Sequence, residues 1–290
     1  MSIPFRREDA LPHGVAEDIS RNVRRIVCNN PGPFTFRGTN TYLIGRGKVA
    51  VLDPGPADDA HLAAILRATA GERITRILVS HTHRDHSPGT AALVAATGAA
   101  TFGFGPHLTP PDAGGEGDDH AFRPDETLAD GAVLEGDEWR LAALHTPGHC
   151  ANHLCFALDG GVLFSADHVM SWSTSVVSPP DGDMAAYMAS LAKVAARDDR
   201  LYLPGHGPPL PDPAPFVAAL AAHRLEREAK VLEALRAARR ATAAELVPPV
   251  YGPELDPRLV PAAARSLLAH LIKLAAEGEA ARDGDAFEAR

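Results

Sequence analysis

His81-Thr82-His83-Arg84-Asp85-His86 places four potential metal ligands within six residues, directly after the apolar run 74–80. Imidazole nitrogens and carboxylate oxygens suit a borderline divalent ion such as Zn²⁺. A strand delivers its last residue to a sheet edge, and the turn that follows can aim alternate residues at one point. We therefore expect His81 and His83 to share one ion, while Asp85 and His86 reach a second. A polar, solvated start of a helix is the alternative interpretation.

Three later clusters repeat the pattern of an apolar run that ends in a turn with His or Asp. They are His145-Thr146-Pro147-Gly148-His149, Phe164-Ser165-Ala166-Asp167-His168 and Pro204-Gly205-His206-Gly207. Glycine and proline set turn geometries that hold a ligand outside the strand ladder. One such histidine alone is typical of a hydrogen-bonded surface residue, so the prediction of a metal centre depends on the ordered set.

In this ordered set the chain resembles the metallo-β-lactamase-fold hydrolases, whose pattern is H-x-H-x-D-H, H-T-P-G-H, a bridging Asp and a late His. The resemblance runs from about Val23 to Gly207. It implies that His81, His83 and His149 hold one metal, that Asp85, His86 and His206 hold the other, and that Asp167 bridges the two. It also implies that Asp53, after the run 50–52, is a buried residue that supports the ligand loop.

A dinuclear centre predicts hydrolysis, because two ions about 3.5–4 Å apart can share a water and bring its pKa towards neutrality. We expect two divalent ions, zinc first, with manganese or iron as alternatives. Asp85 is the expected catalytic residue, since it lies next to the nucleophile and can accept its proton. His145 and His168 are candidates for the proton donor, although we favour a role in orienting the ligands.

Composition predicts a folded, cytoplasmic protein. The 290 residues suffice for one large α/β domain and a small one, and no membrane span is expected. Residues 1–20 lack the apolar region of a secretion signal. Three cysteines are too few for a disulfide framework, and we interpret Cys150 and Cys155 as small buried residues.

The chain is expected to divide near residue 212. Residues 1–211 should form the catalytic domain, an α/β four-layer αββα sandwich, with helices at 60–69, 91–96 and 184–196. The segment 106–131, rich in Gly, Pro and Asp, reads as a long loop. It is either a lid or substrate wall or an ordinary surface excursion.

Residues 212–290 predict a small winged-helix domain. Apolar spacing indicates helices over 215–240 and 258–276, and Thr242-Ala243-Ala244-Glu245 resembles a capping box that opens a short helix between them. Gly278 is expected to end the last helix, and Asp283-Gly284 to turn a final hairpin.

Within the fold, the chain most resembles the lactamase-like endoribonuclease subgroup with a C-terminal winged helix. The supporting segments are 30–43, Gly182-Asp183-Met184 with Tyr187 and Ser190-Leu191, and the winged helix itself. The resemblance implies single-stranded RNA as a substrate. The small-substrate alternative is an ester, thioester or lactone, including glyoxalase II-type thioester hydrolysis. A third alternative is a DNA-binding regulator with a structural metal site.

Charge favours a small substrate. Residues 221–290 contain 11 Lys+Arg and 11 Asp+Glu, so the whole net charge of −9 lies in residues 1–220. A nucleic-acid binder usually carries a basic patch, and the cluster Arg236, Arg239 and Arg240 is modest. We therefore expect the winged helix to pack on the catalytic part or to form a homodimer rather than bind DNA.

Overall fold

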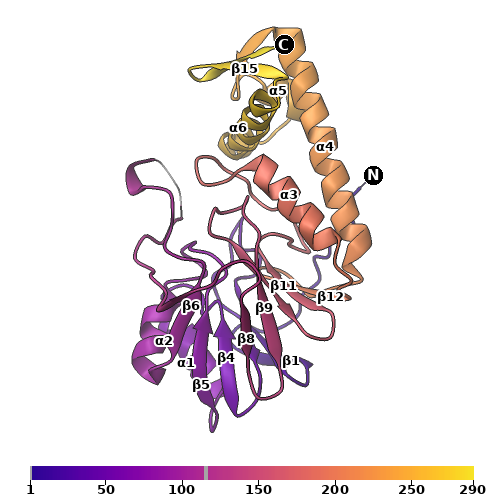
Figure 1. The fold of residues 1–290 in the computed structure, drawn as a ribbon. Coiled ribbons are helices and arrows are strands. Elements are labelled where there is room, and N and C mark those ends of the chain that lie inside the picture. The colour runs from indigo at the N-terminus through magenta and orange to yellow at the C-terminus, as the bar shows by residue number, and fades with distance from the viewer. Residues whose placement is uncertain (1, 114–116) are drawn as a thin grey trace.

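The computed structural model describes residues 2–113 and 117–290. Two β-sheets face each other, with helices on both outer faces (Figure 1). The first sheet follows chain order: β1 (Ala16–Ser20), β2 (Val23–Val27), β3 (Asn40–Ile44), β4 (Lys48–Leu52), β5 (Arg73–Leu78), β6 (Ala100–Gly103) and β7 (Glu126–Thr127). The second runs in the order β13 (Leu210–Pro211), β12 (Leu201–Pro204), β11 (Val162–Ala166), β10 (Leu154–Leu158), β9 (Arg140–His145) and β8 (Val133–Glu135).

Alternating side chains explain the layers. In β5, Leu78 joins the core between the sheets, while its neighbour Ile77 packs outward under helices α1 (Asp59–Ala68) and α2 (Gly89–Thr97). In β11, Phe164 faces the inner core and Leu163 faces helices α3 (Met184–Ala195) and α4 (Pro213–Ala238). Because strands buried on both faces are apolar throughout, each contributes to two cores. The predicted αββα sandwich is confirmed.

The C-terminal module is a winged helix. Its core is formed by the second half of α4, α5 (Val247–Tyr251) and α6 (Val260–Ala276), with a short 3₁₀ turn, η2 (Pro257–Leu259), before α6. The wing is a three-stranded sheet in the order β14 (Arg240–Thr242), β16 (Ala286–Ala289) and β15 (Ala280–Asp283). The helices and the hairpin agree with the sequence prediction, whereas β14 has no counterpart in it.

Two local details differ from prediction. Asp283 pairs with Ala286, so the two turn residues are Gly284 and Asp285 rather than Asp283 and Gly284. Gly284 takes φ +62°, which suits glycine in this turn. The Glu245 carboxylate does accept bonds from the Thr242 backbone and hydroxyl, at 2.8 and 2.9 Å, but the helix itself begins only at Val247.

Helix α4 connects the two parts, rising from the sandwich to the winged helix in Figure 1. Its first half places Phe216 and Leu220 in the core beneath the second sheet, and its second half places Val231 and Leu235 in the winged-helix core. The predicted boundary near residue 212 coincides with the start of α4, although this helix packs against both the sandwich and the winged-helix core. The boundary stays a prediction.

One segment has the length and composition of a membrane span, which the sequence expectation did not anticipate. It is Pro257–Ala276, with a mean hydropathy of 1.4. In the structure Leu267, Leu271 and Leu274 of this segment are buried in the winged-helix core. This packing accounts for the 33% of the segment's apolar window that is buried.

Candidate metal centre

Asp53 fixes the start of the ligand loop. It follows β4, and its carboxylate accepts hydrogen bonds from the Ser80 backbone amide and the Ser80 hydroxyl, both at 2.7 Å. Asp53 also takes φ +51°, a conformation that is strained for a residue with a side chain. The buried Asp53 therefore joins the ends of β4 and β5, as the resemblance implied, and places His81 and His83 at the edge of the first sheet.

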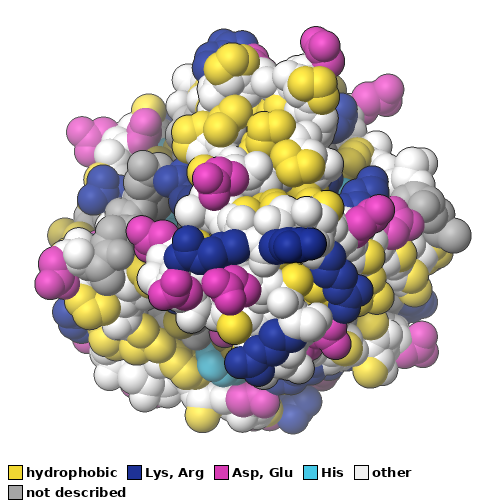
Figure 2. All heavy atoms as spheres, turned by 90° about the horizontal axis from the view of Figure 1, so that it is seen from above, with side chains coloured by type: hydrophobic (Ala, Val, Ile, Leu, Met, Phe, Trp, Pro, Cys, Tyr) yellow, Lys and Arg dark blue, Asp and Glu magenta, His cyan; other side chains and the backbone are white. Residues whose placement is uncertain are grey.

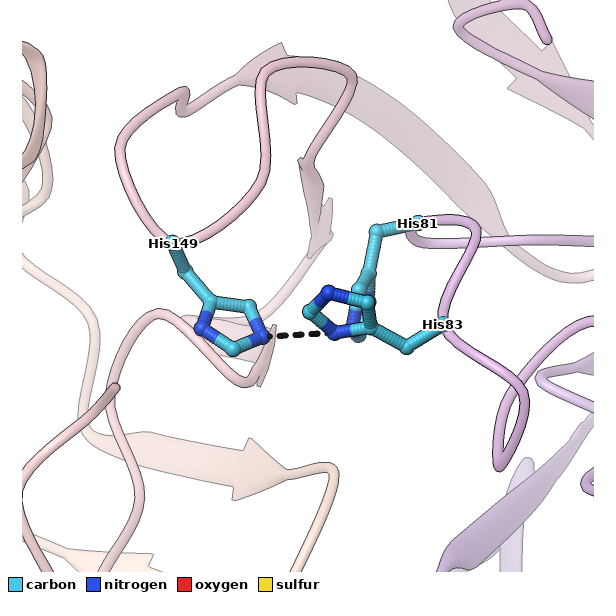
Figure 3. A group of neighbouring side chains, drawn as sticks. All are labelled: His81, His83 and His149. Atoms are coloured by element: carbon cyan, nitrogen blue, oxygen red, sulfur yellow. Dashed lines mark hydrogen bonds between the residues drawn. The ribbon is translucent and has the colours of Figure 1, made fainter. Parts of the chain in front are cut away.

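Three histidines from two loops converge at this edge, as Figure 3 shows for His81, His83 and His149. The Nδ1 atom of His83 lies 3.0 Å from Nε2 of His81 and 3.0 Å from Nε2 of His149. His81 follows β5, whereas His149 lies in the loop between β9 and β10. The predicted first group is therefore assembled across the two sheets.

Hydrogen bonds outside the group determine which nitrogen each ring presents. His149 donates from Nδ1 to the Val176 carbonyl at 2.6 Å, which leaves Nε2 with a free lone pair. His81 donates from Nδ1 to the Ser80 hydroxyl at 2.9 Å, so its Nε2 is also an acceptor. Outer partners of this kind are typical of metal-ligating histidines.

The second group contains Asp85, His86 and His206. Oδ2 of Asp85 lies 3.0 Å from Nε2 of His206 and 3.3 Å from Nε2 of His86, and the two ring nitrogens are 3.3 Å apart. His86 donates from Nδ1 to Asp53 at 2.9 Å, and His206 donates from Nδ1 to the Gly38 carbonyl at 3.2 Å. Both rings thus turn Nε2 towards Asp85.

Asp167 lies between the two groups. Its Oδ2 is 3.6 Å from Nε2 of His149 and 3.4 Å from Nε2 of His206, while Oδ1 is 3.6 Å from Nε2 of His86. Oδ1 is buried and has no hydrogen-bond partner among the described residues. One carboxylate therefore reaches both histidine groups, which is the geometry that a bridging ligand needs.

Glycine makes this close approach possible. A Cβ at Gly205 would lie 2.3 Å from Oδ1 of Asp167 and 2.9 Å from the His86 ring. On the other side, a Cβ at Gly148 would lie 2.3 Å from the Tyr187 backbone, and its φ of +133° also favours glycine. Gly148 in the H-T-P-G-H turn and Gly205 in the P-G-H-G turn are therefore needed because any side chain at these positions would clash with its neighbours.

The electrostatics of the protein side chains differ between the two groups. Burial lowers the pKa of His81 well below its usual value, and burial with the neighbouring His149 lowers the pKa of His83 to about 3. Burial also lowers the pKa of His206, but Asp167 and Asp85 outweigh it and raise that pKa to about 10. The two carboxylates thus favour positive charge at this point, whether carried by protons or by metal ions.

The donor set fits divalent metal ions. Zn–N bonds of about 2.0–2.1 Å in a tetrahedral site place two ligand nitrogens about 3.3 Å apart, close to the 3.0 and 3.3 Å between the histidine nitrogens here. In the first group, neutral imidazoles that present lone pairs to one another cannot donate to one another, so a cation satisfies them best. The buried His and Asp clusters match a metal site.

The two candidate proton donors lie outside this arrangement of ligands. The His168 side chain is fully buried, its ring centroid is 5.0 Å from that of Tyr187, and burial lowers its pKa to about 3. A neutral, buried imidazole does not suit proton donation. His145 stacks on Phe104 at 4.0 Å and donates from Nε2 to the Ala151 carbonyl at 2.9 Å. His145 therefore stabilises the loop that contains His149.

Several neighbouring groups were missed by sequence analysis. His153 is completely buried, and its ring centroid lies 5.1 Å from that of His81. The segment 106–131 lies against the ligand loop: Asp118 is 3.6 Å from Nε2 of His83, and Arg84 donates from its backbone to the Gly117 carbonyl. Residues 114–116 of this predicted loop lie outside the described part of the chain.

The same segment helps to form a second polar cluster around His107. His107, Cys150 and Asp181 bring potential ligand atoms within 4.8 Å of one another, and Asp118 lies 3.4 Å from the His107 ring. Cys150 is buried, as expected, and burial raises the pKa of its thiol well above normal. No sequence motif predicts this cluster, because His107, Cys150 and Asp181 are each more than 30 residues apart.

The chain belongs to the metallo-beta-lactamase superfamily. The family model for that superfamily matches residues 34–206, and a second model, the beta-lactamase associated winged helix domain, matches residues 242–289. The protein is thus a metal-dependent hydrolase of this superfamily with a C-terminal winged helix.

Relatives and solved structures match across both parts. An atrochrysone carboxyl ACP thioesterase of Paecilomyces divaricatus is 30% identical over 277 residues, covering 91% of this chain and 83% of its own. The beta-lactamase-like protein 2 homolog of Drosophila melanogaster is 32% identical over 272 residues, covering 90% of each chain. The structure of a beta-lactamase domain protein from Burkholderia ambifaria has a TM-score of 0.83 at 24% identity, covering 99% and 96%, which shows the shared fold.

Proposed function

We propose that this chain is a dinuclear metal-dependent thioesterase that releases acyl groups from a carrier-bound thiol. The observation that carries the proposal is the combination of the assembled seven-residue centre with relatives named as ACP thioesterases. Those relatives are 30 and 32% identical over 91 and 83% of this chain. Similarity that extends beyond the metal motif to most of the chain supports action on the same class of bond.

In this proposal the ligand sets are those implied by the sequence. His81, His83 and His149 would hold one ion, Asp85, His86 and His206 the other, and Asp167 would contact both. Bound there, two divalent ions, zinc by preference, would activate a shared water and polarise the thioester carbonyl. Asp85 has the more exposed of the two carboxylates, at 27% against 8% for Asp167. It is therefore placed to accept a proton from the attacking water.

The segment 30–43 would hold the second group in place. Asn30 receives the Thr39 backbone amide at 2.9 Å, and the Thr39 hydroxyl lies 3.4 Å from Asp85. Next to it, the Asn40 amide donates to the carbonyls of Pro204 and Gly207, both at 2.8 Å, on either side of His206. This motif therefore positions Asp85 and His206 whatever the substrate is.

The second candidate is endoribonuclease activity on single-stranded RNA. It rests on the resemblance of segment 30–43 and of the winged helix to the lactamase-like endoribonuclease subgroup. The charge of the winged helix does not favour it, because Arg236 pairs with Glu279, and Arg240 pairs with Asp283, at 3.0 and 2.7 Å. Figure 2, seen from the winged-helix end, shows acidic side chains beside basic ones on this face.

The test is thiol release from a simple acyl thioester by metal-analysed protein. We expect turnover by the wild type, and loss of turnover in Asp85→Ala with the fold unchanged. The matched control is Asp137→Ala, which removes an exposed carboxylate that pairs with Lys48. Labelled single-stranded RNA, tested in parallel, decides the second candidate. Cleavage of RNA without thioester turnover would overturn the proposal.

A further inference from the structure

A cleft of about 340 Å³ lies between the catalytic part and the winged helix. It is bounded by the N-terminal segment, the loop after Asp167, and helices α4, α5 and α6. The N-terminal segment is held there by Phe5, whose ring packs against Phe216 of α4 at 6.0 Å. The polar lining comes from Ser2, Ser173, Thr174, His223, Arg224, Arg227, Tyr251 and Ser266.

The charge of this cleft differs from that of the rest of the chain. Two arginines and a histidine line it, and none of its described lining residues is acidic. The whole protein carries a net charge of −9. A concave site with several cationic groups and hydroxyl donors but no carboxylate is built for an anion with several oxygens, as in a phosphate group.

The cationic groups are held in place by aromatic rings. The Arg224 side chain lies over the Tyr187 ring at 5.1 Å and donates to the Ser175 carbonyl, and its Nε atom is buried without a partner among the described residues. Arg227 lies over the Tyr251 ring at 3.9 Å. Stacking orients a guanidinium while leaving its N–H groups available for an anion.

His223 is the third cationic candidate. Its Nδ1 atom is buried and also lacks a hydrogen-bond partner among the described residues. Burial, Arg224 and Arg227 lower the pKa of His223, and they outweigh the opposite effect of Glu226. An anion bound beside the two arginines would offset their repulsion of a protonated His223.

A short segment connects the cleft to the metal centre. Thr174 lines the cleft, the Ser175 carbonyl accepts from Arg224, and the Val176 carbonyl accepts from the ligand His149. These three consecutive residues thus connect the cleft to the metal centre. An elongated substrate with its reactive bond at the metals could extend along this segment into the cleft.

We propose that this cleft binds the phosphate of a phosphopantetheine arm whose thiol carries the acyl group. The inference rests on the proposed thioesterase function and names the substrate feature that the cleft recognises. Arg227 and Arg224, with the hydroxyls of Ser173, Thr174 and Ser266, contact the phosphate oxygens. The metal centre acts on the thioester at the other end of the arm.

The experiment compares one acyl group on two arms, pantetheine and 4′-phosphopantetheine, with metal-loaded full-length protein. In the wild type we expect a lower KM for the phosphorylated arm. Arg227→Gln should raise that KM about tenfold, the effect of losing one charge-assisted hydrogen bond, and leave the kcat/KM for the pantetheine thioester unchanged. Arg227→Lys should restore part of the difference.

Lys230→Gln is the matched control, because it removes one positive charge from an exposed position on the same helix, outside the cleft. It should leave both substrates unchanged. The pantetheine thioester also reports on folding in every variant, so an equal loss on both arms in Arg227→Gln would overturn a role in phosphate binding.

The remaining outcomes separate this inference from the proposed function. Hydrolysis of both thioesters with equal KM in the wild type and in Arg227→Gln would overturn the phosphate site and leave the thioesterase intact. Hydrolysis of neither would refute the thioesterase and the inference with it. RNA cleavage that is lost in Arg227→Gln, without thioester turnover, would assign the cleft to an RNA phosphate instead.

Discussion

Asp53 and His86 are 33 residues apart in the chain, yet Oδ2 of Asp53 lies 2.9 Å from Nδ1 of His86. The same carboxylate receives the Ser80 amide and hydroxyl. Ser80 in turn accepts from His81 at 2.9 Å. One buried carboxylate therefore orients a histidine in each of the two groups of candidate ligands, without belonging to either group.

Asp53→Asn is expected to weaken metal binding at both groups. The Asn side chain presents an N–H donor where His86 and the Ser80 hydroxyl need an acceptor. The His86 ring and the His81 ring, which is held through Ser80, therefore lose their fixed orientation. Loss of such an outer partner typically costs 10–100-fold in metal affinity. Competition with a chelator, followed by metal analysis, measures the change. Asp58→Asn is the control, since Asp58 caps α1 and Asn caps equally well; equal affinities in both variants would contradict the role of Asp53.

Gly205→Ala is expected to remove one metal without unfolding the protein. The new Cβ would lie 2.3 Å from Oδ1 of Asp167 and 2.9 Å from the His86 ring, so the ligands must move apart. Metal content per chain and a thermal unfolding curve measure the two effects separately. Gly32→Ala is a milder change, because its Cβ would meet only the Thr35 hydroxyl at 3.2 Å. Full metal content in Gly205→Ala would show that the turn can relax.

The convergence of the candidate ligands could be predicted because each candidate lies in a short motif after an apolar strand. His81 to His86 are contiguous, and His149, Asp167 and His206 each follow a strand in a Gly-containing or small-residue turn. Short motifs of this kind can be recognised from the sequence without knowledge of long-range contacts. The alternation of Ile77 and Leu78 between two cores likewise explains why the sandwich could be predicted.

The surroundings of the site were less predictable because they depend on long-range contacts. His107 meets Asp181 across 74 residues, and Asp118 reaches His83 from a segment with no periodic pattern. In the winged helix, β14 is three residues long, too short for alternation to show. Pairing with β16, rather than local propensity, makes that segment a strand.

Arg25 is expected to be the most sensitive charged residue outside the centre. Its side chain is 2% exposed and pairs with Asp9 and Glu17, both at 3.0 Å, while Nη1 donates to the Gly207 carbonyl beside His206. Arg25→Ala leaves Asp9 buried without its partner, which typically costs about 3–5 kcal/mol. Urea unfolding measures the loss. Arg21→Ala is the control, because its pair with Glu138 is exposed and should contribute less than about 1 kcal/mol.

Glu228 should make the stability of the winged helix sensitive to acid. Burial raises the pKa of Glu228, but hydrogen bonds from His270 and Lys273, at 3.1 and 2.6 Å, outweigh it and lower the pKa below its usual 4.5. A carboxyl with a lowered pKa in the folded state stabilises fully above its unfolded pKa and loses this contribution as pH falls through the folded value. At neutral pH, Glu228→Gln should therefore reduce the free energy of unfolding by about 1–2 kcal/mol.

The difference between wild type and Glu228→Gln should shrink as the pH falls below about 4.5, because the wild-type carboxyl is then protonated as well. Denaturant unfolding at several pH values between 7 and 3 measures it. Glu233→Gln on the same helix is the control, since no ion pair of Glu233 is found among the described residues and its variant should follow the wild type throughout. A difference in the free energy of unfolding between wild type and Glu228→Gln that stays constant down to pH 3 would show that Glu228 acts through packing rather than through its charge.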